Sequence, residues 1–425
     1  RLLPRMLGFA LGKIGFGRRV ERQADADWSA YQQLVDLDLG DLSDGEVLAH
    51  IQSHFQAVQE TAYFNILAPL MMQLFNLMLD RRLEKFGHDP RLANLKAQDQ
   101  AYDPYLQIGD LYQRYQQLSP ENQRSLERAG AAALAELTDA GDFQDSLAGF
   151  LAQFGHLSDA GNDFSQVPWR ENPELVLDMI RTHDWTEREV EGRELADLRL
   201  TPFQRWRVGP AYRRAIRFQA LREKIGAAYT LGYGLFRKAF RELGARFQDR
   251  GLIDSVDDIM YLKWQEIRSA VHHSPKQLPF QILVSDRKAE LEEARGTHPP
   301  PVIIGDRPVI PAEDTADLLK GTATSRGIYS GPARIVQGLK DINRVQEGDV
   351  LVIPYSDVSW TPLFTKAGAV VAEAGGILSH SSIIAREYGI PAVVAVPGAC
   401  QLPENTLLTV DGNNGQVLIH LDRGQ

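Results

Sequence analysis

A proline-rich stretch divides this chain into two parts with different apolar periodicities, and this change limits what the chain can fold into. From residue 27 to residue 295, apolar residues recur at three- and four-residue spacings, the pattern of amphipathic helices. The pattern is clearest in four segments: Val47–Gln59, Tyr63–Phe86, Pro120–Leu137 and Ala211–Gln248. Ser43 and Ser119 are suited to cap the helices that follow them. We therefore predict a mostly α-helical domain over residues 1–295.

The stretch itself and the residues after it have a different texture. Gly296–Pro311 contains five prolines and predicts a stiff, extended hinge over residues 296–318. Short apolar runs then alternate with turns: Ala333–Val336, Val350–Ile353, Ala369–Ala372, Ala392–Val396, Leu407–Val410 and Val417–Ile419. Helical stretches near Trp360–Lys366 and His380–Tyr388 interrupt these runs. The alternation predicts a compact α/β domain over residues 319–425.

Composition limits the function classes. The net charge of −10 over 425 residues argues against a nucleic-acid binder, which is usually basic. The single cysteine, Cys400, excludes an internal disulfide and fits a reducing compartment, so we expect a cytoplasmic protein. The longest apolar run, Phe64–Leu79, falls short of the roughly 20 residues of a membrane span. We predict that this run is a buried helix and that the protein has no membrane partner. No signal peptide is recognisable and the chain begins at Arg1, so we expect a piece of a longer polypeptide.

One histidine, His380, is set apart by its neighbours. These are residue types that bind phosphate: Gly375, Gly376, Ser379, Ser381, Ser382 and Arg386. Glycines let the backbone approach a phosphate, hydroxyls donate hydrogen bonds, and the predicted helix start adds N–H groups and partial positive charge. Histidine suits phosphoryl carriage because its ordinary pKa lies near neutrality, which leaves a ring nitrogen able to attack. The alternative is a structural histidine, one of ten in the chain.

The residues around His380 also match a known domain. The segment Gly321–Leu421 closely resembles the swivelling phosphohistidine domain of phosphoenolpyruvate-utilising enzymes and related dikinases. The matching motifs include Gly321–Gly327, Gly331-Pro332-Ala333, Thr361-Pro362, Ala367–Gly376, Gly389–Val394 and Val410-Asp411-Gly412. The resemblance implies that His380 carries a phosphoryl group, with Ser379 and Arg386 as supports. It also implies a three-layer β/β/α domain that moves on linkers between two distant sites.

The helical part resembles the central domain of rifampicin phosphotransferase-type enzymes. The matching pieces are Phe154-Gly155-His156, Trp169–Pro173, Leu221–Lys224, Gly251-Leu252-Ile253 and Asp257–Leu262. In that family an ATP-grasp domain precedes an acceptor-binding helical domain and the phosphohistidine domain, and this chain resembles the second and third. The resemblance implies ATP and Mg²⁺ held by an ATP-grasp domain or subunit, without which the chain would be inactive. Dikinases that make phosphoenolpyruvate carry a barrel after the histidine domain; since the chain stops at Gln425, pyruvate is not the expected acceptor.

A loop in the helical part holds further candidate residues. Phe154–Pro173 is rich in glycine, proline and polar residues and predicts an ordered loop. In the family the glycine-histidine pair is followed by arginine and later by glutamate, whereas leucine and glycine stand in those places here. The candidates able to orient or deprotonate an acceptor are His156, Asp159, Asn162 and Asp163. The alternative is a loop whose Asx side chains cap its own backbone.

A basic run follows on a predicted helix: Arg205, Arg207, Arg213, Arg214, Arg217, Arg222 and Lys224. Such a run is commonly a solvated face; the alternative is a docking surface for the phosphorylated carrier, with Arg217 and Arg222 among the acceptor-site candidates. His50 and His54 have the spacing of a metal pair but no third ligand, so we expect no metal site in the chain itself.

Together these features predict a dikinase-type phosphotransferase whose phosphohistidine delivers a phosphoryl group to a small molecule bound by the helical domain. One alternative is an ATP-dependent condensing enzyme of the prodigiosin-synthesis type. Another is a non-catalytic protein that keeps a relic carrier domain. The apolar helix Phe64–Leu79 and the aromatic residues near it in the pattern could line an acceptor pocket or form core: Trp206, Tyr212, Phe218, Tyr229, Tyr233 and Phe236.

Overall fold

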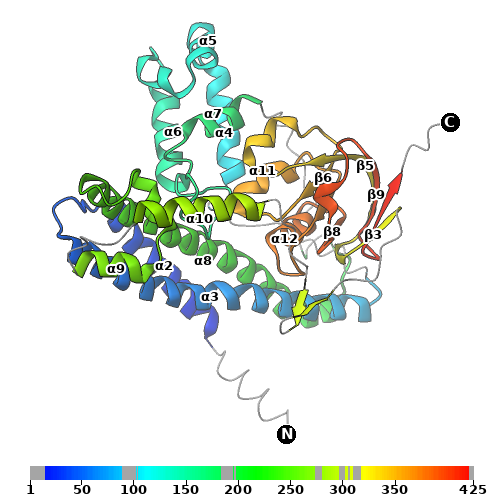
Figure 1. The fold of residues 1–425 in the computed structure, drawn as a ribbon. Helices are drawn as coiled ribbons and strands as arrows, with labels where there is room; N and C mark the ends of the chain where they lie inside the picture. The colour runs from blue at the N-terminus through cyan, green and yellow to red at the C-terminus, as the bar shows by residue number, and fades with distance from the viewer. Residues whose placement is uncertain are drawn as a thin grey trace. The chain divides into compact units, whose positions relative to one another are not determined.

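The computed structural model describes residues 15–88, 102, 104–182, 195, 198–272, 280–295, 302–304, 307–309 and 317–420 (Figure 1). The chain forms two compact units that do not follow chain order. The first unit comprises Arg1–Phe75, Asn162–Ser165 and Arg213–Pro299, and the second comprises Asn76–Gly161, Gln166–Tyr212 and Pro300–Gln425. Most of the predicted hinge lies outside the described residues; within it, β1 (Val302–Ile304) and β2 (Arg307–Val309) pair as an antiparallel hairpin. The domain limits given above stay a prediction.

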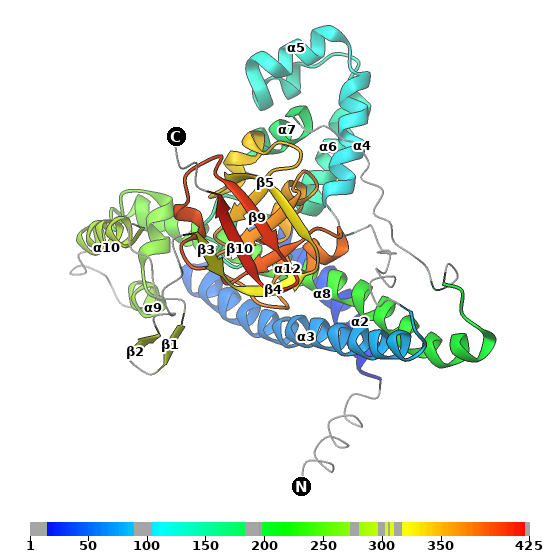
Figure 2. The same cartoon turned by 90° about the vertical axis from the view of Figure 1, so that its right-hand side faces the viewer.

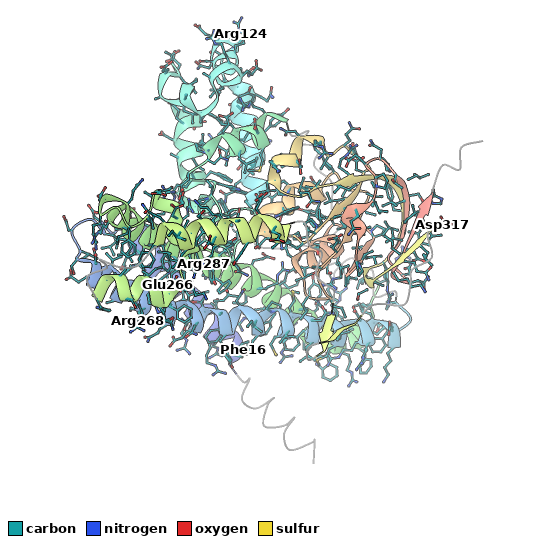
Figure 3. The ribbon with its side chains drawn as sticks, in the orientation of Figure 1. Phe16, Arg124, Glu266, Arg268, Arg287 and Asp317 are labelled. Atoms are coloured by element: carbon teal, nitrogen blue, oxygen red, sulfur yellow. The ribbon has the colours of Figure 1, made fainter. Side chains whose placement is uncertain are left out.

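The first unit is built from helices. It contains α2 (Phe16–Val35), most of α3 (Asp44–Lys85), most of α8 (Pro202–Asp249), η4 (Val256–Tyr261), α9 (Trp264–His272) and α10 (Phe280–Arg295). α3 begins at the predicted cap: Ser43 N donates to Glu46 Oε2 at 2.7 Å, and Glu46 N donates to Ser43 Oγ at 3.3 Å. Glu266 of α9 and Arg287 of α10 point toward one another (Figure 3) and form two hydrogen bonds of 2.8 Å.

Helix α3 corrects one prediction. The run Phe64–Leu79 lies within it, but its large apolar side chains are not all buried: Ile66, Leu70 and Leu74 are 64%, 45% and 43% exposed. Among the described residues, α3 is one helix long and apolar enough to cross a membrane by length and composition, with 17% of the apolar window buried. A single such helix is weak evidence for a membrane span. The prediction of a short, buried helix was wrong because a run that is apolar on all sides does not show which side has a partner.

The second unit combines a helical cluster with a sheet domain. The helices are α4 (Pro104–Gln117), α5 (Pro120–Ala129), η3 (Gly130–Glu136), α6 (Gly141–Phe154) and α7 (Pro173–Thr182), drawn in cyan to green in Figure 1. The predicted cap Ser119 accepts from Asn122 N at 3.2 Å and starts α5. Between α6 and α7, residues 155–172 form turns without helix, as predicted for an ordered loop.

The sheet domain carries one mixed sheet of eight strands in the order β3-β10-β9-β5-β6-β7-β8-β4. The strands are β3 (Leu318–Lys320), β4 (Thr322–Ser325), β5 (Ile328–Ile335), β6 (Val350–Ile353), β7 (Ala369–Ala372), β8 (Ala392–Val394), β9 (Leu407–Asp411) and β10 (Gln416–His420). The shorter elements are η5 (Leu339–Arg344), η6 (Val358–Trp360), α11 (Thr361–Phe364), α12 (His380–Glu387) and η7 (Ala399–Gln401). Strands β5 to β8 are parallel, and the others pair antiparallel. Figure 2 looks onto the layer of β3, β10, β9 and β5.

Side chains alternate between two cores, which gives the three predicted layers. Val350 and Val352 of β6 point into a core shared with Leu408 and Val410 of β9, so the two halves of the sheet pack face to face. Leu351 and Ile353 point to the opposite face, which is covered by helices and by the core of the helical cluster. A helical N-terminal region followed by a β/β/α domain is therefore confirmed as the fold class.

Candidate active site

His380 is the first residue of α12, directly after the loop that leaves parallel strand β7. α12 lies against β4, β7 and β8, and its residues Ser381 to Ala385 are buried. In parallel sheets, ligands bind where strands end and helices begin, because loop backbone and helix N-terminus meet there. The chain thus fixes the helix from behind and presents His380, which is partly exposed, at its N-terminal end.

The glycine pair shapes the loop before this helix. Gly375 has φ +134°, and a Cβ atom there would lie 2.9 Å from Ser379 Oγ, so a larger residue would be strained and crowded. The carbonyl oxygen of Gly376 accepts from Ser379 N at 2.9 Å, from Ser379 Oγ at 2.8 Å and from Ser382 Oγ at 2.8 Å. Ser381 Oγ lies 3.1 Å from Ser379 Oγ. The serine hydroxyls therefore form one network around the loop.

This network has a consequence for the helix end. Ser379 occupies the N-cap position, but its hydroxyl turns back to the loop and makes no capping hydrogen bond. The N-terminal end of α12 thus lacks a side-chain cap, and it is the end at which the helix dipole favours negative charge. A phosphoryl group on His380 would sit at this end, beside hydroxyls that can turn to donate to it.

The imidazole of His380 is held by residues of the neighbouring turn. Its Nε2 lies 3.3 Å from Thr361 Oγ1, and the Thr361 hydroxyl donates to Val358 O at 2.8 Å. The ring of Phe364 stands edge-on to the imidazole, with centroids 6.3 Å apart. Thr361 is 4% exposed, so its position is fixed by packing. The sequence reasoning used Thr361-Pro362 as a matching motif but did not assign Thr361 to the site; its nearness to His380 depends on the fold.

Arg386 braces the loop in this state. Its Nη2 donates to Ile377 O at 2.8 Å and its Nη1 to Thr324 O at 3.4 Å, which ties the loop before α12 to strand β4. This is a supporting contact to backbone carbonyls. Its predicted contact with phosphate oxygens stays a prediction.

The predicted acceptor-site residues belong to both units. His156 and Asp159 are in the second unit, while Asn162, Asp163, Arg217 and Arg222 are in the first. Burial, with a smaller effect of Arg170, lowers the pKa of His156 to about 3, so this ring is neutral at physiological pH. Burial raises the pKa of Asp159, whose Oδ2 accepts from Leu339 N at 3.3 Å.

The candidates in the first unit have different surroundings. Asn162 and Asp163 are exposed, and Asp163 Oδ1 accepts from Ser165 N at 2.9 Å and from Ser165 Oγ at 2.6 Å, the local cap expected of an Asx residue. Arg217 is exposed and pairs with Glu21 at 3.1 Å. Arg222 is 8% exposed and pairs with Glu223, so it does not belong to a solvated basic face.

Within the described residues, no group of three or more histidine, cysteine, aspartate or glutamate side chains is placed to hold a metal ion. His54, one of the pair with metal spacing, places Nε2 2.6 Å from Gly232 O inside the first unit. The Mg²⁺ and ATP implied by the resemblance thus have no counterpart in these residues and stay predictions about an ATP-grasp part.

Comparisons with known proteins agree with both resemblances. The mobile domain of PEP-utilising enzymes matches residues 345–415, and the fourth domain of rifampicin phosphotransferase matches residues 67–223. The chain is a relative of the phosphoenolpyruvate-utilising enzymes. The first match contains His380 and its glycine and serine neighbours, and the second contains the loop with His156 and Asp159 together with Arg217 and Arg222.

Three relatives show how far the similarity extends. An uncharacterised protein of Mycobacterium tuberculosis is 32% identical over 286 residues, 66% of this chain and 32% of that protein. Rifampicin phosphotransferase of Bacillus subtilis is 28% identical over 312 residues, 67% of this chain and 36% of that protein. A prodigiosin-synthesising transferase of Serratia marcescens is 28% identical over 298 residues, 65% of this chain and 33% of that protein. The chain thus spans about a third of the length of these relatives.

Proposed function

We propose that this chain is the carrier and acceptor-binding part of a phosphotransferase, in which His380 takes up a phosphoryl group and passes it to a small molecule. The observation that carries the proposal is the position of His380 at the uncapped N-terminus of α12, within the matched mobile domain. ATP is the proposed donor, bound with Mg²⁺ by an ATP-grasp domain or subunit. We expect the protein to act in the cytoplasm without membrane or nucleic acid.

The proposed chemistry has three transfers. A ring nitrogen of His380 attacks the β-phosphorus of ATP, the bond to the α-phosphate oxygen breaks, and AMP leaves. The terminal phosphoryl group of the resulting pyrophosphoryl-histidine passes to water or phosphate. An acceptor hydroxyl then attacks the remaining phosphorus and gives its proton to a base, and the N–P bond breaks to return free histidine. Throughout, the start of α12 and the serine hydroxyls offset the phosphoryl charge, while Thr361 and Phe364 fix the ring.

An apolar acceptor is supported by the first unit. Ile66, Leu70 and Leu74 follow one another at four-residue spacing on α3 and are all exposed, so they form one apolar row on the helix. By contrast Phe218 and Phe236, which the sequence placed either in a pocket or in the core, are 6% and 4% exposed and belong to the core. We propose that the apolar part of the acceptor packs on the row of α3.

A second function has one specific point in its favour. The Serratia relative is named as a transferase that synthesises prodigiosin, so the same pair of domains could activate one partner for bond formation. Product analysis separates the two: a condensing enzyme gives a ligated product and no phosphorylated end product. A relic carrier protein gives neither, and no labelled histidine.

The test is phosphate labelling of the chain in an extract of its own cells. The donors are ATP labelled at the β-position, ATP labelled at the γ-position and labelled phosphoenolpyruvate, each with wild type, His380→Ala and His420→Ala. The last is a control, since His420 is an exposed histidine of β10 in the same domain. We expect acid-labile label from β-labelled ATP in wild type and His420→Ala but not in His380→Ala. Label in all three proteins would refute the assignment of His380, label from phosphoenolpyruvate alone would reverse the donor, and no label would favour the relic protein.

A further inference from the structure

The loop after α6 is hydrogen-bonded to the sheet domain that carries His380. Four hydrogen bonds join them: Ser359 Oγ to Ser158 O at 2.7 Å, Trp360 Nε1 to Asp159 O at 2.9 Å, Leu339 N to Asp159 Oδ2 at 3.3 Å, and Gly161 N to Asp357 Oδ2 at 2.7 Å. Each links residues about 180 to 200 positions apart in the chain. All of these residues belong to the second unit, so the contact lies within one compact body.

Apolar side chains surround these hydrogen bonds. Trp360 and Leu339 are 0% exposed and lie in the same core as Leu157 of the loop and Ile180 of α7. α7 contacts η5, and α11 contacts α4, as Figure 1 shows for the region around α11. A buried tryptophan whose indole N–H is satisfied by the other side is typical of an anchor residue in an interface.

The docked turn is also the turn that holds the carrier histidine. Trp360, which donates to the loop, is followed directly by Thr361, whose hydroxyl lies 3.3 Å from His380 Nε2. Ser359 and Asp357 are in the same turn, and Thr361 donates to Val358 within it. Docking of the loop and placement of the imidazole therefore depend on one short segment, residues 357–361.

We infer that the loop Ser158–Gly161 is a releasable latch, which docks the phosphohistidine domain on the helical cluster through the turn at Trp360. The inference rests on the proposed function, since release is needed only if His380 collects its group elsewhere. The form of the contact supports release. All four bonds join turns or short 3-10 segments, and none belongs to a strand pair or to an α-helix, so they can open while both parts stay folded.

Amide hydrogen exchange on the intact chain tests the latch without any activity. Leu339 N–H and Gly161 N–H donate across the contact, so they report on its opening. We expect both amides to exchange at least about tenfold faster than the amides of Val352 and Val371 in the central strands β6 and β7. Equal protection of the two sets would mean that the domain is permanently attached and would overturn the inference.

Two variants weaken the latch from the domain side. Trp360→Phe keeps an aromatic ring but removes the donor to Asp159 O. Gly338→Ala adds a Cβ atom that would lie 2.7 Å from Asp159 Oδ2 and so displaces that carboxylate from Leu339; Gly338 has φ −176°, which any residue adopts. Each should speed exchange at Gly161 about tenfold, since one net hydrogen bond is about one power of ten in an equilibrium constant. The control is Asp341→Ala, which removes a carboxylate that accepts from Gln337 N within the domain. If the control has the same effect, general loosening explains the result and the latch is refuted.

A cross-link tests whether release is needed for charging. The Cβ position at Gly338 lies 3.8 Å from Asp159 Cγ, so Gly338→Cys with Asp159→Cys places two sulfurs within reach. Cys400 should not compete, because burial raises the pKa of its thiol to about 12. We expect the oxidised protein to lose labelling of His380 at least about tenfold and to regain it on reduction. Equal labelling of both forms would overturn the latch. If the reduced protein and wild type both take no label, the proposed function fails instead, and hydrogen exchange still decides on the latch.

Discussion

Replacing His156 by glutamine should change how the stability of the second unit depends on pH. Burial, followed by the charge of Arg170, lowers the pKa of His156 from 6.5 to about 3, against a weaker opposing hydrogen bond with the backbone of Gln153. The folded protein therefore keeps this ring neutral between those two values. The unfolded chain, in contrast, takes up a proton below pH 6.5. Because the unfolded state binds the extra proton, His156 lowers the stability of the fold as the pH falls from 6.5 toward 3.

The size of the effect follows from the two pKa values. At pH 7.5 the ring is neutral in both states, so it contributes almost nothing to the pH dependence. At pH 5 protonation favours the unfolded chain by at most about 2 kcal/mol, which is about 1.36 kcal/mol for each pH unit below 6.5. Glutamine carries no proton in either state and removes this term.

The assay is equilibrium unfolding in urea at pH 7.5, 6 and 5, followed by tryptophan fluorescence, for wild type and His156→Gln. The difference in free energy of unfolding at pH 7.5 measures the contacts that the ring makes. We expect that difference to shift in favour of the variant by about 1 to 2 kcal/mol on going to pH 5. A difference that is constant across this range would show that the ring titrates alike in both states, and it would refute the reasoning from burial.

Three further substitutions test the site and its surroundings. Thr361→Val keeps the side-chain shape but removes the hydroxyl beside His380 Nε2, so labelling of His380 should slow about tenfold, and Thr361→Ser should restore it. Asp80→Asn should stabilise the protein by about 1 kcal/mol at pH 7.5, because burial and then Glu84 raise the pKa of Asp80 to about 6; the partial exposure of the carboxyl keeps the gain well below the full shift, and urea unfolding at pH 3.5 should show none, since the carboxyl is then protonated in both states. Gly375→Ala should cost about 1 to 3 kcal/mol of unfolding free energy and slow labelling, because φ +134° and the Ser379 hydroxyl leave no room for a methyl group.

The sheet domain could be predicted from the sequence to within a few residues. Strands β6 and β7 match the runs Val350–Ile353 and Ala369–Ala372, and every residue of both is buried. Central parallel strands are covered on both faces, so they read as short, continuous apolar runs that end at turns. β3 and β4 were missed, because Leu318–Lys320 and Thr322–Ser325 are short edge strands with polar residues. Their existence depends on β10 and β8, which lie about 70 to 100 residues further along the chain.

The helical region was harder to predict in one respect. Periodicity located α3 and its cap at Ser43, since both depend on neighbouring residues. It could not show that Ile66 and Leu70 would be exposed, because the burial of a helix face depends on a partner that is distant in the sequence. The same limit applies to Thr361 and His380, whose contact at 3.3 Å joins two helix starts on neighbouring elements.

Asp159 separates the two roles open to the loop after α6. As a general base for the acceptor it must take up a proton, and as part of the latch it must accept from Leu339 N–H. Asp159→Asn keeps an oxygen that can accept from Leu339 but cannot act as a base, whereas Gly338→Ala leaves the carboxylate intact and disturbs its contact. From the docking geometry we expect Asp159→Asn to retain transfer to the acceptor within about threefold and Gly338→Ala to lose more, measured as decay of labelled His380 on addition of acceptor. General-base catalysis is worth about 10² to 10⁴ in rate, so a loss of that size in Asp159→Asn, with Gly338→Ala nearly unaffected, would assign the carboxylate to chemistry instead.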